Sequence, residues 1–167
     1  MRRPILVLAI LVATMAPAPS SPNVDLGWLQ GRWSCDGGGY DGAQITEVIG
    51  RAIGPSYVTL SWHSERDDVR YELRRQRGGT WNVLGRAEEK RTHDFAAWNL
   101  EQRSAKPGDV TFEGTARLVK SRVQTEQMRI RWQILETGQG AMAQWRWYYI
   151  DNRWTNAQSK HCRLTSA

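Results

Sequence analysis

The chain has 167 residues, of which 40% are hydrophobic, and its formal net charge is +6. This length supports one domain with a single hydrophobic core. Most of the 23 basic residues are arginines, and the excess supports only a mild attraction to anionic surfaces or ligands. We therefore expect no nucleic-acid partner.

Residues 1–20 have the pattern of a secretory signal peptide. An arginine pair precedes an apolar run, 5–16, and small residues and prolines follow. The run is too short to span a bilayer comfortably, and the prolines disfavour the alternative, a buried N-terminal helix. We expect cleavage of 1–20, a single domain over 21–167, and a secreted or periplasmic protein without a membrane span.

The chain has two cysteines, one near each end of this domain: Cys35 and Cys162. An even count in an exported protein indicates a disulfide. Two free buried thiols are the alternative.

Beyond the signal peptide, the dominant hydrophobic period is two. Val58, Leu60 and Trp62 alternate with polar neighbours, and 128–134 and 145–149 show the same pattern. Such alternation indicates strands with one buried and one solvated face. Turn signals separate about ten predicted strands, near 31–36, 43–52, 57–65, 69–76, 80–86, 92–101, 109–119, 123–136, 142–151 and 157–164.

These strands predict an all-β fold, because only 25–30 offers a short helical turn. Many antiparallel strands with short hairpins form either a closed meander barrel or a sandwich. The nine tryptophans favour the barrel, where large rings fill or line the interior. We expect an antiparallel up-and-down barrel of about eight to ten strands.

The segment DLGWLQGRW, 25–33, resembles the entry of lipocalin-like (calycin) barrels. In that family a short turn leads into a Gly-x-Trp strand whose tryptophan plugs one end of the barrel. The resemblance implies this structural role for Gly31 and Trp33. The glycines at 37–39 then mark a bend after the first strand.

The two ends of the domain carry a second resemblance, to small secreted bacterial barrels of uncharacterised function. Those barrels show Gly-x-Trp-x-Cys near the start and Cys-Lys/Arg at the end, as in 31–35 and 162–163 here. In a barrel the first and last strands are neighbours, so the resemblance implies a Cys35–Cys162 disulfide.

No motif indicates an enzyme, a metal site or a cofactor. None of the three histidines has a partner at zinc-ligand spacing. His93 and Asp94 are adjacent and would face opposite ways on a strand, so they do not form a base and its orienter. Asp36 and Asp41 lack calcium-loop spacing.

His161 has one specific alternative role. Nitrobindin-like haem barrels also open with Gly-x-Trp, and their haem-ligating histidine lies in a His-x-Arg context, which 161–163 resembles. A disulfide at Cys162 on the inner face would turn His161 outward, away from an interior haem.

Basic and aromatic residues alternate along two neighbouring predicted strands, 123–136 and 142–151. One shared face would suit stacking on bases or an anionic ligand. Alternation favours instead tryptophans inside and a charged outer wall, which holds Arg129, Arg131 and Arg146. The tryptophans expected to face inward and to line any pocket are Trp62, Trp132, Trp145 and Trp147.

Three functions remain open from the sequence. The first is an exported non-enzymatic barrel that binds a small apolar or amphipathic ligand in its mouth. The second is a barrel filled by its own side chains that acts as an envelope interaction module. The third is haem binding through His161.

Overall fold

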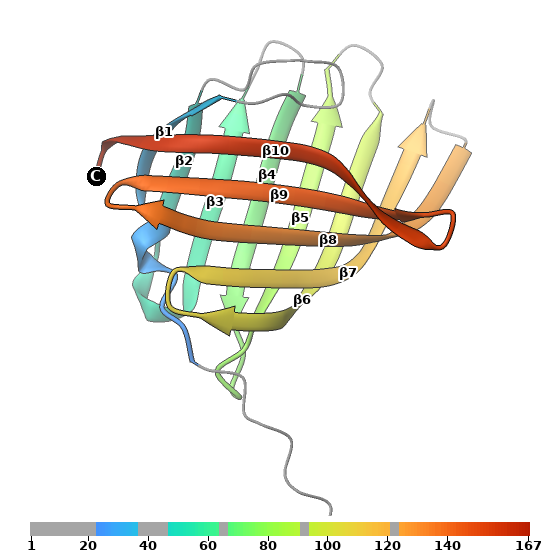
Figure 1. The fold of residues 1–167 in the computed structure, drawn as a ribbon. Coiled ribbons are helices and arrows are strands. Elements are labelled where there is room, and N and C mark those ends of the chain that lie inside the picture. Colours follow the sequence, from blue (N-terminus) through green and yellow to red (C-terminus); the bar gives the residue numbers. More distant parts are fainter. Residues whose placement is uncertain (1–22, 37–46, 64–66, 91–93, 121–123) are drawn as a thin grey trace, which may run out of the picture.

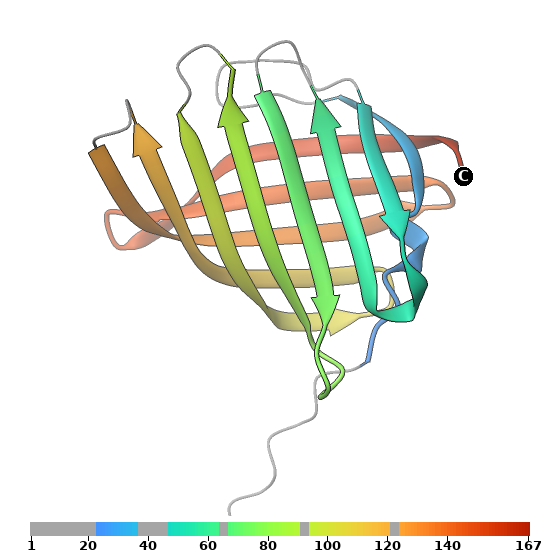
Figure 2. The same ribbon diagram turned by 180° about the vertical axis from the view of Figure 1, so that it is seen from behind.

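The computed structural model describes residues 23–36, 47–63, 67–90, 94–120 and 124–167. Ten strands close into an antiparallel barrel in which each strand pairs with its neighbours in sequence and β1 pairs with β10. In Figure 1 the three C-terminal strands cross the front, and Figure 2 brings the wall formed by β3, β4 and β5 forward. This confirms the expected all-β, up-and-down barrel, and it is consistent with a lipocalin-like architecture. The expected signal peptide lies outside the described residues.

The first half of the barrel contains five strands and two short 3-10 turns: η1 (Gly27–Leu29), β1 (Gly31–Asp36), β2 (Glu47–Ala52), η2 (Gly54–Ser56), β3 (Tyr57–His63), β4 (Asp67–Arg75) and β5 (Trp81–Glu89). The second half contains five longer strands: β6 (Phe95–Lys106), β7 (Asp109–Lys120), β8 (Gln124–Gly138), β9 (Ala141–Ile150) and β10 (Arg153–Ser166).

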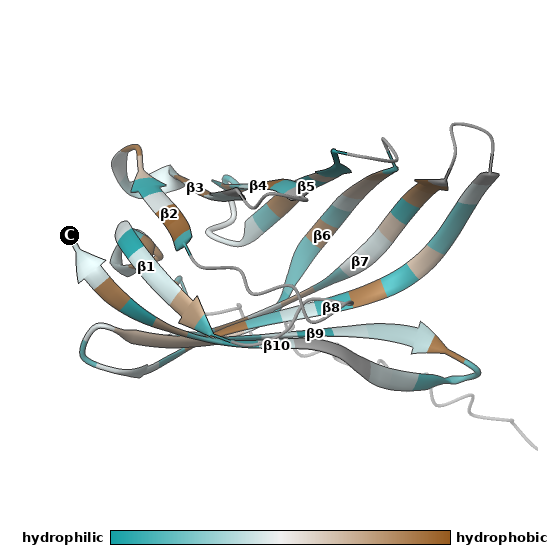
Figure 3. Ribbon diagram, turned by 90° about the horizontal axis from the view of Figure 1, so that it is seen from above, coloured by the Kyte–Doolittle hydropathy of each residue, from teal (hydrophilic) through white to brown (hydrophobic). Residues whose placement is uncertain are grey.

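The expected period of two is present in the strands. Buried and exposed residues alternate strictly along β1, and brown and teal bands alternate along several strands in Figure 3. Several boundaries differ from the sequence prediction, and the two largest differences among the described residues lie in β6 and β10. β6 continues to Lys106, and β10 begins at Arg153. The early start of β10 follows from the turn at Asp151 and Asn152. Both residues have positive φ and form a two-residue hairpin loop, so that Arg153 already pairs with Ile150.

One end of the barrel, the η1 end, is closed by the segment that precedes β1. Trp33 Nε1 donates a hydrogen bond to the Leu29 carbonyl at 3.1 Å, and Trp81 Nε1 donates to Val24 at 3.0 Å. Gly50 permits this packing, since a Cβ there would lie 1.8 Å from the Leu29 carbonyl oxygen. Trp33 is therefore buried near one end of the barrel, as expected.

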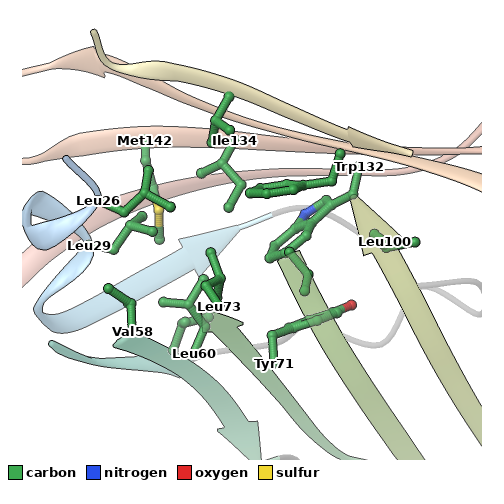
Figure 4. Close-up of a cluster of buried hydrophobic side chains, with 14 of the residues drawn as sticks. Leu26, Leu29, Val58, Leu60, Tyr71, Leu73, Leu100, Trp132, Ile134 and Met142 are labelled. Atoms are coloured by element: carbon green, nitrogen blue, oxygen red, sulfur yellow. The ribbon is translucent and has the colours of Figure 1, made fainter. Parts of the chain in front are cut away.

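An apolar core fills the barrel above η1. Figure 4 shows Leu26 and Leu29 close to Met142, and Leu60 beside Leu73. Every labelled side chain in this cluster is almost fully buried. Odd-numbered strands run away from η1 toward the opposite end, which we call the mouth.

The seam between β1 and β10 closes the barrel. Cys35 lies directly opposite Cys162, with 4.0 Å between their Cα atoms, and the two form a disulfide. Gly31 begins the seam at φ 124°, where a Cβ would lie 2.5 Å from Leu164. The expected cross-link between the ends of the barrel is confirmed.

Candidate functional site: a cationic centre below the barrel mouth

The inner face of β9 is polar toward the mouth. Gln144 pairs with Ile134 and Arg146 pairs with Trp132 of β8. Directly opposite residues share a face of the sheet. Because Ile134 and Trp132 are buried inside the barrel, Gln144 and Arg146 also point inward.

Arg146 is the centre of this site. Its guanidinium is buried and donates hydrogen bonds to the phenol oxygens of Tyr71 and Tyr148. The guanidinium carbon also lies 5.1 Å from the ring centre of Trp98 and 5.6 Å from that of Tyr71. Arginine over an aromatic face is a favourable cation–π geometry.

Tyr71, one of the two hydrogen-bond partners of Arg146, is neutral at physiological pH. Burial raises the pKa of Tyr71 to about 12, although the charge of Arg146 opposes this shift. Burial also opposes the charge of Arg146, but Tyr71 and Tyr148 raise its pKa above the usual value. Arg146 is thus a buried cation whose polar partners, among the described residues, are two phenol hydroxyls.

Two donors in this centre have no acceptor within the described part of the chain. They are the Nε of Arg146 and the indole Nε1 of Trp98, and both atoms are inaccessible to solvent. Buried donors without acceptors are costly, so their presence suggests a place for a ligand or water oxygen.

A second cation, Lys160, lies close by on β10. Its side chain is 2% exposed, and its ammonium lies 4.2 Å from the ring centre of Trp62. Lys160 of β10 pairs with Gln144 of β9, and Gln144 lies two residues before Arg146 on the same strand. Two buried cations, Arg146 and Lys160, therefore lie against aromatic rings in the mouth half of the interior.

An aromatic layer separates this centre from the apolar core. The Tyr71 ring lies 4.4 Å from Trp132, 5.0 Å from Trp62 and 5.4 Å from Trp98, measured between ring centres. Gly85 permits the arrangement, since a Cβ there would lie 2.6 Å from Trp98 and 2.8 Å from Tyr71. A ligand inside the barrel that contacts Arg146 would therefore lie on the mouth side of this layer.

A small hollow of about 190 Å³ lies at the rim formed by β5, β6 and β7, and its lining is mainly apolar but also includes Glu89 and Asp94. Its lining includes Ala87, Ala96 and Leu118, which pair across the three strands. Ala96 lies two residues from Trp98 on the same strand face. The hollow thus lies one step nearer the mouth than Trp98.

Of the four tryptophans that were expected to face inward, two do so and two face outward. Trp62 and Trp132 are buried in the interior. The expectation is wrong for Trp145 and Trp147, which pair with Gln133 and Arg131 of β8 and share their outer face. Apolar character misassigned the faces of β9, because its inner face holds the polar residues of the cationic centre.

The other sequence candidates lie apart from this centre. His161 is exposed on the outer face, where its ring lies 6.2 Å from that of Trp145. It does not point toward an interior haem. Asp36 ends β1 in an exposed position. His93 and Asp41 lie outside the described residues.

The sequence prediction missed Arg146, Lys160 and Tyr71. A signal existed for Lys160, which lies two residues before Cys162 and therefore shares its inward face. No comparable signal marked Arg146, which sits between two tryptophans in a strand that resembles a charged outer wall.

The described residues contain no cluster of three His, Cys, Asp or Glu side chains that could hold a metal ion. In the same part of the chain, no helix is long and apolar enough to cross a membrane. The fold and the site together define a closed antiparallel barrel with a buried cationic centre. A scan against protein-family models finds no match for this chain, and a search of the curated proteins finds no relative.

Proposed function

We propose that this chain is an exported, non-enzymatic barrel that binds a small amphipathic molecule with an acidic headgroup. The headgroup lies at Arg146, and the apolar part extends along the mouth toward Ala96 and Leu118. Export is supported by the Cys35–Cys162 disulfide and by the pattern of residues 1–20.

The observation that carries the proposal is the state of Arg146. It is a buried cation hydrogen-bonded to two phenol oxygens, with its Nε and the nearby Trp98 Nε1 lacking acceptors among the described residues. A carboxylate supplies negative charge and acceptor oxygens together, which fits this set of donors. Lys160 adds positive charge on the neighbouring strand.

The headgroup is expected to dominate selectivity. Charge-assisted hydrogen bonds contribute roughly 1.5–3 kcal/mol each, so loss of one lowers affinity by about tenfold or more. The hollow at the rim measures only about 190 Å³, so it is expected to discriminate weakly between apolar tails.

The test compares decanoate with decanol, which have the same tail and differ in headgroup charge. Binding is measured by calorimetry and by tryptophan fluorescence for the wild type, Arg146→Met and Arg86→Met. Arg86 is the control because it is an exposed arginine on the outer face of β5.

The proposal expects the wild type and Arg86→Met to bind decanoate at least about tenfold more tightly than decanol, and Arg146→Met to lose this preference. Equal affinity for the two ligands, an unaffected Arg146→Met variant, or no binding by the wild type would each contradict it.

A further inference from the structure

The outer face of β9 and β10 carries aromatic side chains that the barrel interior does not use. Trp145, Trp147 and Tyr149 follow one another on the outer face of β9, and Trp154 joins them from β10 opposite Tyr149. All four are partly exposed. We call these four residues the aromatic face.

Arginines from β8 lie against this face. The guanidinium carbon of Arg131 is 4.3 Å from the ring centre of Trp154, and that of Arg129 is 4.8 Å from the ring centre of Tyr149. Both arginines also bond Glu113 on β7, at 3.0 and 2.6 Å respectively. One carboxylate is thus shared between two cations, so the surface keeps positive charge.

The aromatic face borders a hollow of about 430 Å³ on the outer wall. Two rings, two guanidiniums, two hydroxyls and one amide line it, and among the described lining residues there is no acidic side chain. The lining residues are Arg103, Ser104, Thr111, Arg131, Gln133, Trp147 and Trp154.

We propose that this hollow and the aromatic face bind a chain of acidic sugars, with a sugar ring against Trp147 and a carboxylate at Arg103 or Arg131. The C–H face of a sugar ring packs on an indole. Its hydroxyl groups match the neutral donors and acceptors of Ser104, Thr111 and Gln133.

The balance of charge and neutral polarity favours this ligand over a nucleic acid. Single-stranded nucleic acids also stack on aromatic rings, but a deoxynucleotide chain offers no sugar hydroxyl groups along its length to a lining of neutral donors and acceptors, whereas each acidic sugar offers free hydroxyls beside its carboxylate. Here two arginines line the hollow, and Glu113 offsets part of the charge beside it. A carboxylated, hydroxyl-rich chain matches that mixture more closely.

This site is separate from the cationic centre below the mouth. Trp147 points outward and Arg146 points inward from adjacent positions on β9, so the two sites lie on opposite sides of one strand. Their ligands can therefore be tested independently.

The experiment measures binding of an oligogalacturonate, a neutral cello-oligosaccharide and an oligothymidylate of matched length, by calorimetry at low and moderate salt. The variants are Trp147→Ala and Arg131→Gln. Arg86→Gln is the control on the outer face of β5, and near-ultraviolet circular dichroism with thermal unfolding checks folding of each variant.

The proposal expects oligogalacturonate to bind most tightly and more weakly as salt rises. Trp147→Ala should weaken binding by about tenfold or more, as loss of a stacked ring does in other aromatic sites, and Arg86→Gln should leave it unchanged. Arg131→Gln, which keeps Trp147, should reduce the preference for the acidic over the neutral chain.

Three results would overturn the proposal: no binding of oligogalacturonate, equal binding of the neutral chain, or tighter binding of oligothymidylate. A folded Trp147→Ala or Arg131→Gln variant with unchanged affinity would also overturn it. None of these results depends on whether decanoate binds at Arg146.

Discussion

The two halves of the barrel interior differ in what they contribute. At the η1 end, Leu29, Leu73 and Leu100 are fully buried among other aliphatic groups. Toward the mouth, the cations Arg146 and Lys160 lie inside instead. The Nε of Arg146 and the Nε1 of Trp98 have no acceptor among the described residues, as is also true of Trp28 Nε1 and Gln102 Nε2 at the η1 end. Apolar burial stabilises a fold, whereas unsatisfied buried polarity weakens it and is typical of functional sites. We infer that apolar burial in the η1 half stabilises the fold, whereas the buried polar groups of the mouth half lower its stability and are available for binding.

The largest expected loss of stability comes from opening the seam between β1 and β10, which closes the barrel around both halves of the interior. The disulfide closes a sequence separation of 127 residues. Replacing Cys35 and Cys162 together by serine should lower the free energy of unfolding by about 4–5 kcal/mol in the chain-entropy model. Urea denaturation followed by circular dichroism measures the change, with the reduced wild type as control. An unchanged unfolding midpoint would contradict the structural role of the cross-link.

The next largest expected effect is a difference in stability between an inward-facing and an outward-facing leucine on adjacent strands. Leu100 is fully buried in the η1 half, whereas Leu84 on the adjacent strand is 46% exposed. Leu100→Ala should cost about 3 kcal/mol because it leaves a cavity, and Leu84→Ala should change stability by less than about 0.5 kcal/mol. Chemical denaturation of the two variants measures the contrast. Similar losses in both would mean that the assigned faces of β5 and β6 are incorrect.

Alkaline pH probes the aromatic layer at the boundary of the two halves. Burial raises the pKa of Tyr71 to about 12 in the folded protein, above its ordinary value of 10.0. An unfolded chain therefore loses this proton first, so stability falls as pH rises from about 10 to 12, by roughly 2–3 kcal/mol. Tyr71→Phe should show a shallower decline in denaturation experiments across this window. The same slope in the variant would argue against a buried neutral phenol.

The smallest expected effect on stability is at the cationic centre itself. Arg146→Met removes a buried charge and leaves an apolar side chain of similar length. The change removes the desolvation cost of a buried charge but also removes the hydrogen bonds that Tyr71 and Tyr148 accept, so we expect stability to change by no more than about 1 kcal/mol. Thermal unfolding in the absence of ligand measures this. A loss comparable to that of Leu100→Ala would place Arg146 among the residues that stabilise the fold.

Much of the barrel was predictable from local pattern. Val58, Leu60 and Trp62 follow the period of two, and they occupy the inner face of β3. Turns expected at Gly78–Gly79 and at Asp151–Asn152 follow β4 and β9, which end within about a residue of the predicted positions. The Gly-x-Trp segment also led to the correct position for Trp33, because a short turn before it covers one end of the barrel.

The candidate site was less predictable, because hydrophobicity alone assigned the faces of β9. Trp145 and Trp147 are more apolar than Gln144 and Arg146, yet they face outward. The energy of a buried arginine depends on Tyr71, Tyr148 and Trp98, which lie far away in sequence. No local pattern contains that information.

The sequence by itself determined the strands, the turns and the two cysteines at the ends of the domain. Only the tertiary structure decided which face of β9 is interior and where along β10 the inner and outer faces exchange. The register of β10 against β9 shifts between Asn156 and Gln158, so Trp154 lies outside while Lys160, an even number of residues later, lies inside. The physical reason is that a bulge changes the phase of a strand's alternation, and its position is fixed by pairing with a neighbour rather than by the strand's own residues.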